Sequence, residues 1–431
     1  MAPISEVKRR EMQTIENRKR AEEVVARCRK LATFSEDPAS LRRTFLSPPM
    51  RDCHREIASW MKPLGVSPGL DPAGNLRALY PSAQLGAPRL MIGSHLDTVP
   101  NAGAFDGVLG VVLAVSLLEA LEGRRLPFAI EVIGFSDEEG IRFGVPFIGS
   151  RALVGRLDEQ LLELQDREGI SVRKAIQNFG LNPAGQAQAR PTKEAFAYVE
   201  FHIEQGPVLE KLGLPLAAVE TIAGQTRIEC TFFGRSNHAG TTPMHLRYDA
   251  LAAAAEWVTA VESVARNTTG LVATVGKIEA KPGATNVIAG EARLTLDVRH
   301  RSDEIRVRAA KTLVEGAEGI AERRGITAHW NTSLDQRAVP MNPFLVDEIE
   351  QAIRKTGCTP HRMMSGAGHD AMIMAEKIAS SMIFLRTPGG ISHDPAESVA
   401  VEDVAKAIEC GLHLLDQLAS STLLQERMGR A

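Results

Sequence analysis

The fold is decided by residues 89–140, which read RLMIGSHLDTVPNAGAFDGVLGVVLAVSLLEALEGRRLPFAIEVIGFSDEEG. The opening RLMIGSHLDT (89–98) predicts a buried strand that runs into a polar loop. DGVLGVVLAVSLLEALEG (106–123) predicts a helix that is apolar almost all round and ends at Gly123, which is typical of a helix buried against a sheet. FAIEVIGFSDEEG (128–140) predicts a second strand followed by a polar loop. Such alternation of strands and helices indicates an α/β sheet.

The chain outside this stretch predicts two domains. AFAYVEFHIEQG (195–206) again predicts a strand that ends in a polar loop, and α/β patterning returns after residue 340. Between them the chain predicts further strands and helices: strands at 226–234, 271–278 and 286–299, and helices at 248–265 and 302–324, the latter capped by Ser302. The order βαββαβ is ferredoxin-like. We therefore expect a mixed-sheet α/β domain formed by 1–221 and 333–431, with a ferredoxin-like domain inserted at 222–332.

Composition excludes several classes of protein. The 431 residues are 44% hydrophobic and 24% charged, which is ordinary for a globular chain of two or three domains. Lys+Arg is 50 and Asp+Glu is 53, and the net charge of −3 gives no indication of nucleic-acid binding. The charged N-terminal segment has no apolar signal core and no membrane span is expected. Five scattered cysteines without a CxxC pair predict a reduced, cytoplasmic protein, in which His and carboxylate would hold any metal.

Histidine, aspartate and glutamate are concentrated in five short segments at predicted strand ends or turns. They are GSHLDTVP (93–100), GAFDG (103–107), SDEEG (136–140), FHIEQGP (201–207) and ISHDPAE (391–397). Each segment alone has an ordinary explanation, such as a solvated turn, a surface acidic pair or a hydrogen-bonded core histidine. In open α/β sheets, however, sites gather at the carboxyl ends of strands. Together the five segments therefore predict one site.

The residue types in these segments fit a pair of divalent cations. Such cations accept imidazole and carboxylate ligands, and two of them ~3.5–4 Å apart can share one carboxylate, which requires about five ligands. The chain offers five: His95, Asp106, Glu139, His202 and His393. Neighbouring side chains on an extended segment point in different directions, so Glu139 can bind metal while Glu138 faces the water as a general base. Asp97, two residues after His95, could accept the imidazole N–H and fix its tautomer.

The five segments resemble the M20 metallopeptidase superfamily, whose order is HxD, Asp, Glu-Glu, His and a late His, over roughly residues 20–415. HIEQGP around His202, GRSNHAGTTPM (234–244) and SGAGHDA (365–371) are similar to its hydantoinase/carbamoylase branch. The resemblance implies that the inserted domain is a lid and dimerisation domain, and that Glu138 is the general base. It also implies two cations, zinc, manganese, cobalt or nickel, one on His95, Asp106 and His202 and the other on Asp106, Glu139 and His393.

The resemblance also implies a set of substrate-binding residues: Gln205, His238, Asn286, Arg299, Gly368 and His369. Arg299 ends a predicted strand on its polar face, and a guanidinium pairs bidentately with a carboxylate, although an exposed strand arginine is the simplest reading without the resemblance. His238 is implied to stabilise an oxyanion, often from a neighbouring subunit; taken alone it is a loop histidine. The other four are ordinary surface, turn or loop residues when taken alone.

The activity that the resemblance implies is hydrolysis of the carbamoyl (ureido) C–N bond of a small N-carbamoyl-L-amino acid, by a cytoplasmic homodimer. The products would be the amino acid, ammonia and carbon dioxide. An allantoate amidohydrolase needs the same metals and carboxylate clamp, so that alternative stays open. A dipeptidase or aminoacylase fits HIEQGP and GAGHDA less well. A metal-dependent binding protein without catalysis would have no need of Glu138.

Overall fold

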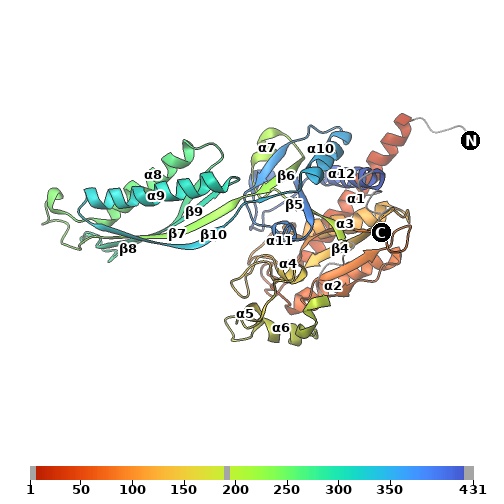
Figure 1. Cartoon of the computed structure of the whole chain (residues 1–431), viewed down its shortest axis with the longest axis horizontal. Coiled ribbons are helices and arrows are strands. Elements are labelled where there is room, and N and C mark those ends of the chain that lie inside the picture. Colours follow the sequence, from red (N-terminus) through yellow and green to blue (C-terminus); the bar gives the residue numbers. More distant parts are fainter. Residues whose placement is uncertain (1–5, 189–194, 422–431) are drawn as a thin grey trace, which may run out of the picture. The chain divides into compact units, whose positions relative to one another are not determined.

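The computed structural model describes residues 6–188 and 195–421, which form two compact units (Figure 1). The main unit contains the described residues of Met1–Glu220, Met341–Met363 and His369–Ala431. The inserted unit contains Thr221–Pro340 together with Met364–Gly368.

A nine-stranded mixed sheet, counted over the described residues, organises the main unit. Its strands lie in the order β1 (Gly69–Leu70), β2 (Leu76–Tyr80), β4 (Ala129–Phe135), β3 (Arg89–His95), β5 (Ala195–Ile203), β13 (Ala379–Leu385), β6 (Leu216–Ile222) and β11 (Val339–Pro340), with β12 (Arg362–Ser365) paired to β6. The central strands β4, β3, β5 and β13 are parallel, whereas β2 and β6 run antiparallel to their neighbours. The predicted mixed α/β sheet is therefore confirmed.

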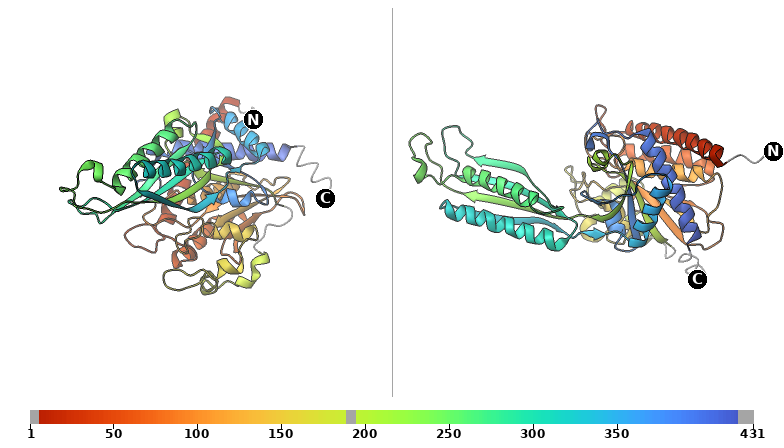
Figure 2. Two further views of the ribbon diagram at one scale, coloured as in Figure 1. Left: turned by 60° about the vertical axis from the view of Figure 1, so that its left-hand side comes forward. Right: turned by 90° about the horizontal axis from the view of Figure 1, so that it is seen from above.

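Helices of the main unit pack around this sheet. They are α1 (Glu6–Ala32), α2 (Pro48–Met61), α3 (Val108–Ala120), α4 (Ile148–Leu153), α5 (Glu159–Leu162), α6 (Val172–Asn178), α7 (Val208–Leu212), α10 (Pro343–Lys355), α11 (Asp370–Met374) and α12 (Val401–Ser420). Helices α1, α3 and α12 contact one another (Figure 2), and α11 contacts β5, β13 and α4. Residues 5–31 of the charged N-terminal segment have the pattern of an amphipathic helix and correspond to α1, with residue 5 outside the described residues.

Helix α3, which lies within residues 89–140, is almost entirely buried. Its residues Val108–Leu118 are all buried, because the helix contacts β3 and β5 on one side and α1 and α12 on the other. The helix begins at Val108 rather than at the predicted residue 106, so Asp106 lies in the turn before it. Gly110 lies so close to β5 that a Cβ there would be 2.2 Å from the carbonyl oxygen of Phe201. The absence of a side chain at Gly110 thus fixes the distance between helix and sheet.

The inserted unit is a four-stranded antiparallel sheet with two helices. The strands lie in the order β10 (Thr327–Gln336), β7 (Gly224–Phe233), β9 (Glu291–His300) and β8 (Val272–Lys281), and the helices are α8 (Ala250–Arg266) and α9 (Asp303–Arg323). This is the predicted βαββαβ order. The core includes Phe232, Trp257 and Leu294, and the Trp257 indole donates to the Leu313 carbonyl at 2.7 Å. Ser302 caps α9 as predicted, by accepting from the Ile305 N–H.

Two predicted boundaries of the inserted domain differ from the structure. Its predicted end at residue 332 falls inside β10, and the unit continues to Pro340. The polar pattern of β10 hides this, because it is a mostly exposed edge strand with a register shift between Thr332 and Leu334. The strand predicted from 286 starts at Glu291, since the preceding residues pair with the turn at 237–239 instead. Residues 364–368 join the unit from far along the chain.

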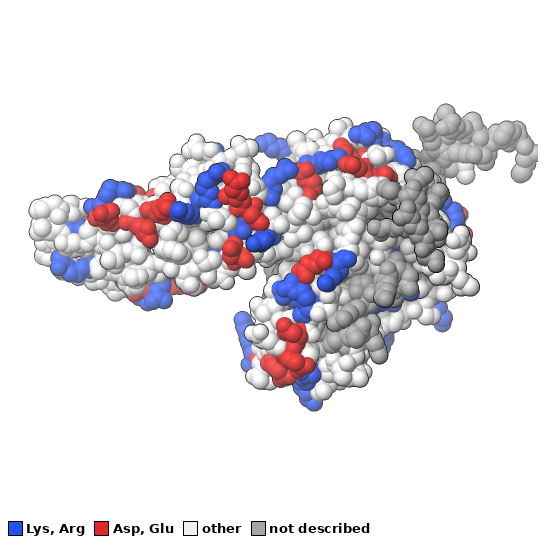
Figure 3. Space-filling model, in the orientation of Figure 1, with Lys and Arg blue, Asp and Glu red and all other residues white. Residues whose placement is uncertain are grey.

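Charged side chains on the surface are mixed in sign. On the face drawn in Figure 3, basic and acidic residues lie interspersed. In the inserted unit, the Glu256 carboxylate of α8 accepts from Arg323 at 2.6 Å and from Arg324 at 2.8 Å, which ties α8 to the end of α9. Among the described residues, no helix combines the length and the apolar character that crossing a bilayer requires.

Replacing Gly110 with alanine should destabilise the main unit, although alanine usually stabilises a helix relative to glycine. The added methyl group meets the β5 backbone, and overpacking of this kind costs about 1–3 kcal/mol. The matched control is Gly316→Ala in α9, where a Cβ meets nothing within 4 Å and the change should add about 0.5–1 kcal/mol of stability. Calorimetric unfolding measures both. Equal effects of the two substitutions would contradict the close packing of α3 on β5.

Candidate active site

The candidate site lies where four neighbouring parallel strands end. His95 is the last residue of β3, the acidic turn 136–140 follows β4, His202 is near the end of β5, and His393 follows β13. The carboxyl ends of adjacent parallel strands share one edge of a sheet, so these segments meet there. The structure groups all five predicted metal ligands in overlapping sets, and within each set the candidate ligand atoms lie within 4.8 Å of one another.

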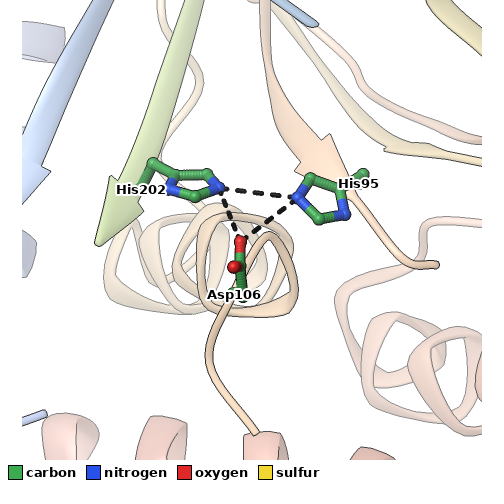
Figure 4. Close-up of side chains that lie close together, drawn as sticks. All are labelled: His95, Asp106 and His202. Carbon is green, nitrogen blue, oxygen red and sulfur yellow. Dashed lines mark hydrogen bonds and ion pairs between the residues drawn. The ribbon is translucent and has the colours of Figure 1, made fainter. Parts of the chain in front are cut away.

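One set consists of His95, Asp106 and His202, which are all buried (Figure 4). The Asp106 Oδ1 atom lies 3.1 Å from His202 Nε2 and 3.5 Å from His95 Nε2. The two Nε2 atoms are themselves 3.5 Å apart. Three ligand atoms from three segments therefore converge on one small volume.

The hydrogen bonds of the two imidazoles indicate which species can bind between His95, His202 and Asp106. His95 Nδ1 lies 3.0 Å from the Asp97 carbonyl oxygen, and His202 Nδ1 lies 2.8 Å from the Ile203 carbonyl oxygen. A carbonyl only accepts, so each ring carries a proton on Nδ1, and in its neutral form it turns an Nε2 lone pair towards Asp106. In that form two buried lone pairs face each other and a carboxylate oxygen with no donor between them. A divalent cation fits this donor set, because imidazole nitrogens and a carboxylate are its usual ligands.

The second set lies on the other oxygen of Asp106. The Oδ2 atom lies 3.2 Å from His393 Nε2, and His393 Nε2 lies 3.7 Å from Glu139 Oε1. Gln205 donates to the same Oδ2 at 2.8 Å, as does the Ser392 hydroxyl at 3.0 Å. Asp106 thus turns one oxygen to each set, which is the arrangement of a carboxylate that bridges two cations.

The electrostatics of the cluster are dominated by buried carboxylates. Burial raises the pKa of Glu138 well above its usual value, and Glu139 and Asp370 raise it further, partly opposed by His95. Burial and the nearby Asp106 raise the pKa of Glu139 to about 7. Burial alone would also raise the pKa of Asp106, but the adjacent side chains of His202, His393 and His95 hold it well below the usual range. A cation bound beside Glu138 and Glu139 would favour their charged forms and so oppose these raised pKa values.

Asp97 lies beside the His95 imidazole, but its backbone carbonyl is closer to the ring than its carboxylate is. Its carboxylate lies 3.5 Å from His95 Nδ1, whereas its own backbone carbonyl lies at 3.0 Å and is the better acceptor. The carboxylate instead accepts from the backbone N–H groups of Glu138 at 2.9 Å and Glu139 at 3.1 Å. Sequence spacing could not separate the carbonyl from the carboxylate. Asp97 therefore holds the imidazole with its main chain and the Glu138–Glu139 turn with its side chain.

Comparison with known proteins identifies the family of this chain. The model of the family described as Peptidase family M20/M25/M40 matches residues 91–417. The chain belongs to the M20 family. It is an amidohydrolase of that family, and members of the family are metal-dependent.

Relatives of this M20 chain have two kinds of name. N-carbamoyl-L-amino acid amidohydrolase from Geobacillus stearothermophilus is 40% identical over 84% of this chain and 90% of that protein. Allantoate deiminase from Arabidopsis thaliana is 38% identical over 93% of this chain and 82% of that protein. A solved structure from Burkholderia multivorans, an amidase of the hydantoinase/carbamoylase family, superposes with a TM-score of 0.87 at 29% identity, covering 93% of this chain and 98% of that one.

Sequence reasoning missed Glu397, which fixes the backbone at Asp106. The buried Glu397 carboxylate accepts from the N–H groups of Phe105 at 2.8 Å and Asp106 at 3.0 Å, and from the Ser392 hydroxyl at 3.2 Å. It thereby joins the Asp106 turn to the loop that carries His393. The segment ISHDPAE already contains this glutamate, but no local pattern indicates that it binds the backbone of Phe105 and Asp106.

A second missed carboxylate is Glu200, on β5. It is fully buried and accepts from the Ser94 hydroxyl and from the Ala371 N–H, both at 2.9 Å. Its candidate ligand atom also belongs to a set with His202 and His369. An acidic residue within the apolar pattern of β5 was the available signal. Glu200 joins β3 and the start of α11 beside the site.

The predicted substrate residues of the main unit lie against the metal ligands. Gln205 has a φ of +59° and one N–H of its amide donates to Asp106, while its Oε1 is buried without a hydrogen bond among the described residues. The buried His369 ring lies 4.4 Å from the His202 ring. Burial, with His202 adding to it, lowers the pKa of His369 well below its usual value, so this imidazole is neutral.

The remaining predicted substrate residues belong to the inserted unit. His238 and Asn286 are exposed and lie on two segments that pair with each other, since the Ala239 N–H donates to the Asn286 carbonyl at 2.8 Å. The N–H groups of Gly240 and Thr241 donate to His238 Nδ1, which leaves the proton of the neutral ring on Nε2. Such a ring can donate one hydrogen bond outward. Arg299 and Gly368 also belong to this unit.

Replacing Gly107 with alanine should empty the site of metal. A Cβ at Gly107 would lie 2.3 Å from His95 Nε2, the atom that faces Asp106. Gly123→Ala is the matched control, because Gly123 also has a positive φ but nothing lies within 4 Å of its Cβ position. Both changes should cost about 1–2 kcal/mol of stability for the left-handed backbone. Only Gly107→Ala should lower bound metal after dialysis, and full metal content in that variant would contradict the convergence on Asp106.

Proposed function

We propose that this amidohydrolase cleaves the carbamoyl C–N bond of a small ureido acid, with N-carbamoyl-L-amino acids as its first substrates. The products are then an amino acid, ammonia and carbon dioxide. The observation that carries the proposal is the division of the Asp106 carboxylate between two ligand sets, directly beside the acidic turn with Glu138. Relatives named for N-carbamoyl-L-amino acid and allantoate hydrolysis support the ureido chemistry.

Two divalent cations are the proposed cofactors. His95 and His202 would hold one with Asp106 Oδ1, and Glu139 and His393 would hold the other with Asp106 Oδ2. Zinc, manganese, cobalt and nickel all accept such ligands. When bound, the cations supply acidification of water and polarisation of the carbonyl group.

The residues of the chain supply proton transfer and orientation. Glu138 takes the proton of the attacking water and returns it to the leaving nitrogen, a task suited to a carboxyl group whose pKa is raised by burial. His238 donates from Nε2 to the oxyanion that forms on the carbamoyl carbonyl. Arg299 binds the substrate carboxylate, and Asn286 contacts the carboxylate end of the substrate as well. Gln205, Gly368 and His369 contact the rest of the substrate.

Allantoate is the second candidate substrate. It also combines a carboxylate with ureido groups, and the 38% identical plant protein is named an allantoate deiminase. The same two cations, Glu138 and Arg299 would serve both substrates. A dipeptidase is a weaker proposal, because the relatives quoted above are named for ureido acids.

We further propose that the enzyme acts in the cytoplasm as a homodimer joined through the inserted unit. The edge strand β8 of that unit exposes the apolar side chains of Val272 and Ile278, which supports pairing with a second copy.

Glu138→Gln should abolish turnover without emptying the metal site. The amide cannot accept a proton from water, but Glu138 is not among the five proposed ligands, so the two sets that share Asp106 remain intact. The matched variant is Glu139→Gln, which should lose metal. Elemental analysis of both proteins, together with ammonia release, measures the two effects. Substantial activity in Glu138→Gln would refute its role as the base.

A substrate panel tests the activity itself. Metal-reconstituted protein should release ammonia fastest from N-carbamoyl-L-amino acids, more slowly from allantoate, and should leave dipeptides intact. Chelation should stop the reaction, and zinc, manganese, cobalt or nickel should restore it. Faster turnover of allantoate would make allantoate the preferred substrate. Cleavage of dipeptides alone would overturn the proposed ureido-acid activity.

A further inference from the structure

The guanidinium of Arg299 is held in a fixed position inside the inserted unit. Its Nε donates to Asp297 Oδ1 at 2.8 Å and its Nη2 donates to Asp297 Oδ2 at 3.0 Å, while Nη1 donates to the Gly366 carbonyl at 2.7 Å. Asp297 and Arg299 are two residues apart on β9 and therefore share one face of the sheet. The intervening Val298 points to the opposite face and is buried in the core.

The pattern of these bonds leaves a defined part of the guanidinium free. An arginine has five N–H donors, one on Nε and two on each Nη. The bonds to Asp297 and Gly366 use one donor on each of the three nitrogens, so within residues 6–188 and 195–421 one N–H remains on Nη1 and one on Nη2. Two such N–H groups are what a carboxylate needs for bidentate binding.

Asp297 is itself fixed by β7. Arg227 and Gln225 are paired with Asp297 and Arg299 in the strand register, and both donate to Asp297 Oδ2, Arg227 at 3.1 Å. Burial alone would raise the pKa of Asp297, but its hydrogen bonds to Arg299, Gln225 and Arg227 hold it below the usual value, so it stays charged. Asp297 carries one negative charge between two arginines. The cluster therefore keeps a net positive charge that can attract an anion.

We propose that Asp297 is a positioning residue that presents the free edge of Arg299 to the substrate carboxylate. The inference rests on the proposed carboxylate-binding role of Arg299. An isolated arginine on a strand loses side-chain entropy when it binds, whereas Arg299 has already been ordered by Asp297 and Gly366. Asp297 thus strengthens the binding of acids with a free carboxylate and contributes nothing to the chemistry at the carbamoyl group.

The test is Asp297→Asn in the full-length, metal-loaded enzyme. The amide keeps the shape but loses the charge and one acceptor, so KM for an N-carbamoyl-L-amino acid should rise about tenfold or more while kcat changes less than about twofold. With the carboxamide of the same substrate, Asp297→Asn and the parent enzyme should have the same KM. Glu291→Gln is the matched control, because Glu291 binds Arg293 two residues later on the same strand and should leave both KM values unchanged.

Arg299→Ala separates failure of this inference from failure of the proposed function. If Arg299→Ala leaves KM unchanged, the proposed binding of the substrate carboxylate by Arg299 is wrong. If Arg299→Ala raises KM but Asp297→Asn behaves like Glu291→Gln, the positioning role of Asp297 is wrong, whereas carboxylate binding by Arg299 is supported. The double variant should match Arg299→Ala alone, because Asp297 acts only through Arg299. A further rise in KM, or a fall in unfolding temperature beyond that of Glu291→Gln, would show a merely structural role.

Discussion

The site depends on one constraint, the placement of a single buried carboxylate so that its two oxygens face two different ligand sets. Asp106 achieves this because it lies in the turn just before α3 rather than within the helix. Glu397 binds its backbone N–H, and Gly107 leaves room for the His95 ring beside it. Any rotation of the Asp106 side chain would separate the histidines of one set from the glutamate of the other.

The fold creates this constraint through the parallel centre of the main sheet. Four strands end at one edge, and each contributes at least one polar segment there. Because these segments meet at one edge, several buried carboxyl groups lie close together, and the pKa values of Glu138 and Glu139 are both raised. Cations offset that repulsion, so binding of metal and stability of this edge should be thermodynamically linked. The inserted unit contributes no metal ligand to these sets and instead holds a fixed guanidinium and an exposed histidine.

Much of this arrangement was predictable from sequence, because it depends on local patterns. The strand pattern that ends near His95 and the apolar run that ends at Gly123 predict β3 and α3 within a few residues of their observed bounds. The βαββαβ order of the inserted unit also follows from local periodicity. The convergence of the five ligands followed from the rule that sites gather at the ends of parallel strands.

Other features could not be predicted because they depend on contacts between distant segments. Glu397 and Asp106 are 291 residues apart, and no local pattern relates them. The spacing of His95 and Asp97 does not reveal whether the carbonyl or the carboxylate binds the ring. The predicted end of the inserted domain at residue 332 falls inside β10, since an exposed edge strand has little hydrophobic alternation. The contact between Arg299 and Gly366 likewise joins segments far apart along the chain.

The most direct test of the bridging role of Asp106 is anomalous X-ray diffraction from crystals of the metal-loaded protein. The account predicts two cation peaks ~3.5–4 Å apart on either side of the Asp106 carboxylate, one beside His95 and His202 and one beside Glu139 and His393. A single peak, or two peaks of which only one contacts Asp106, would contradict it.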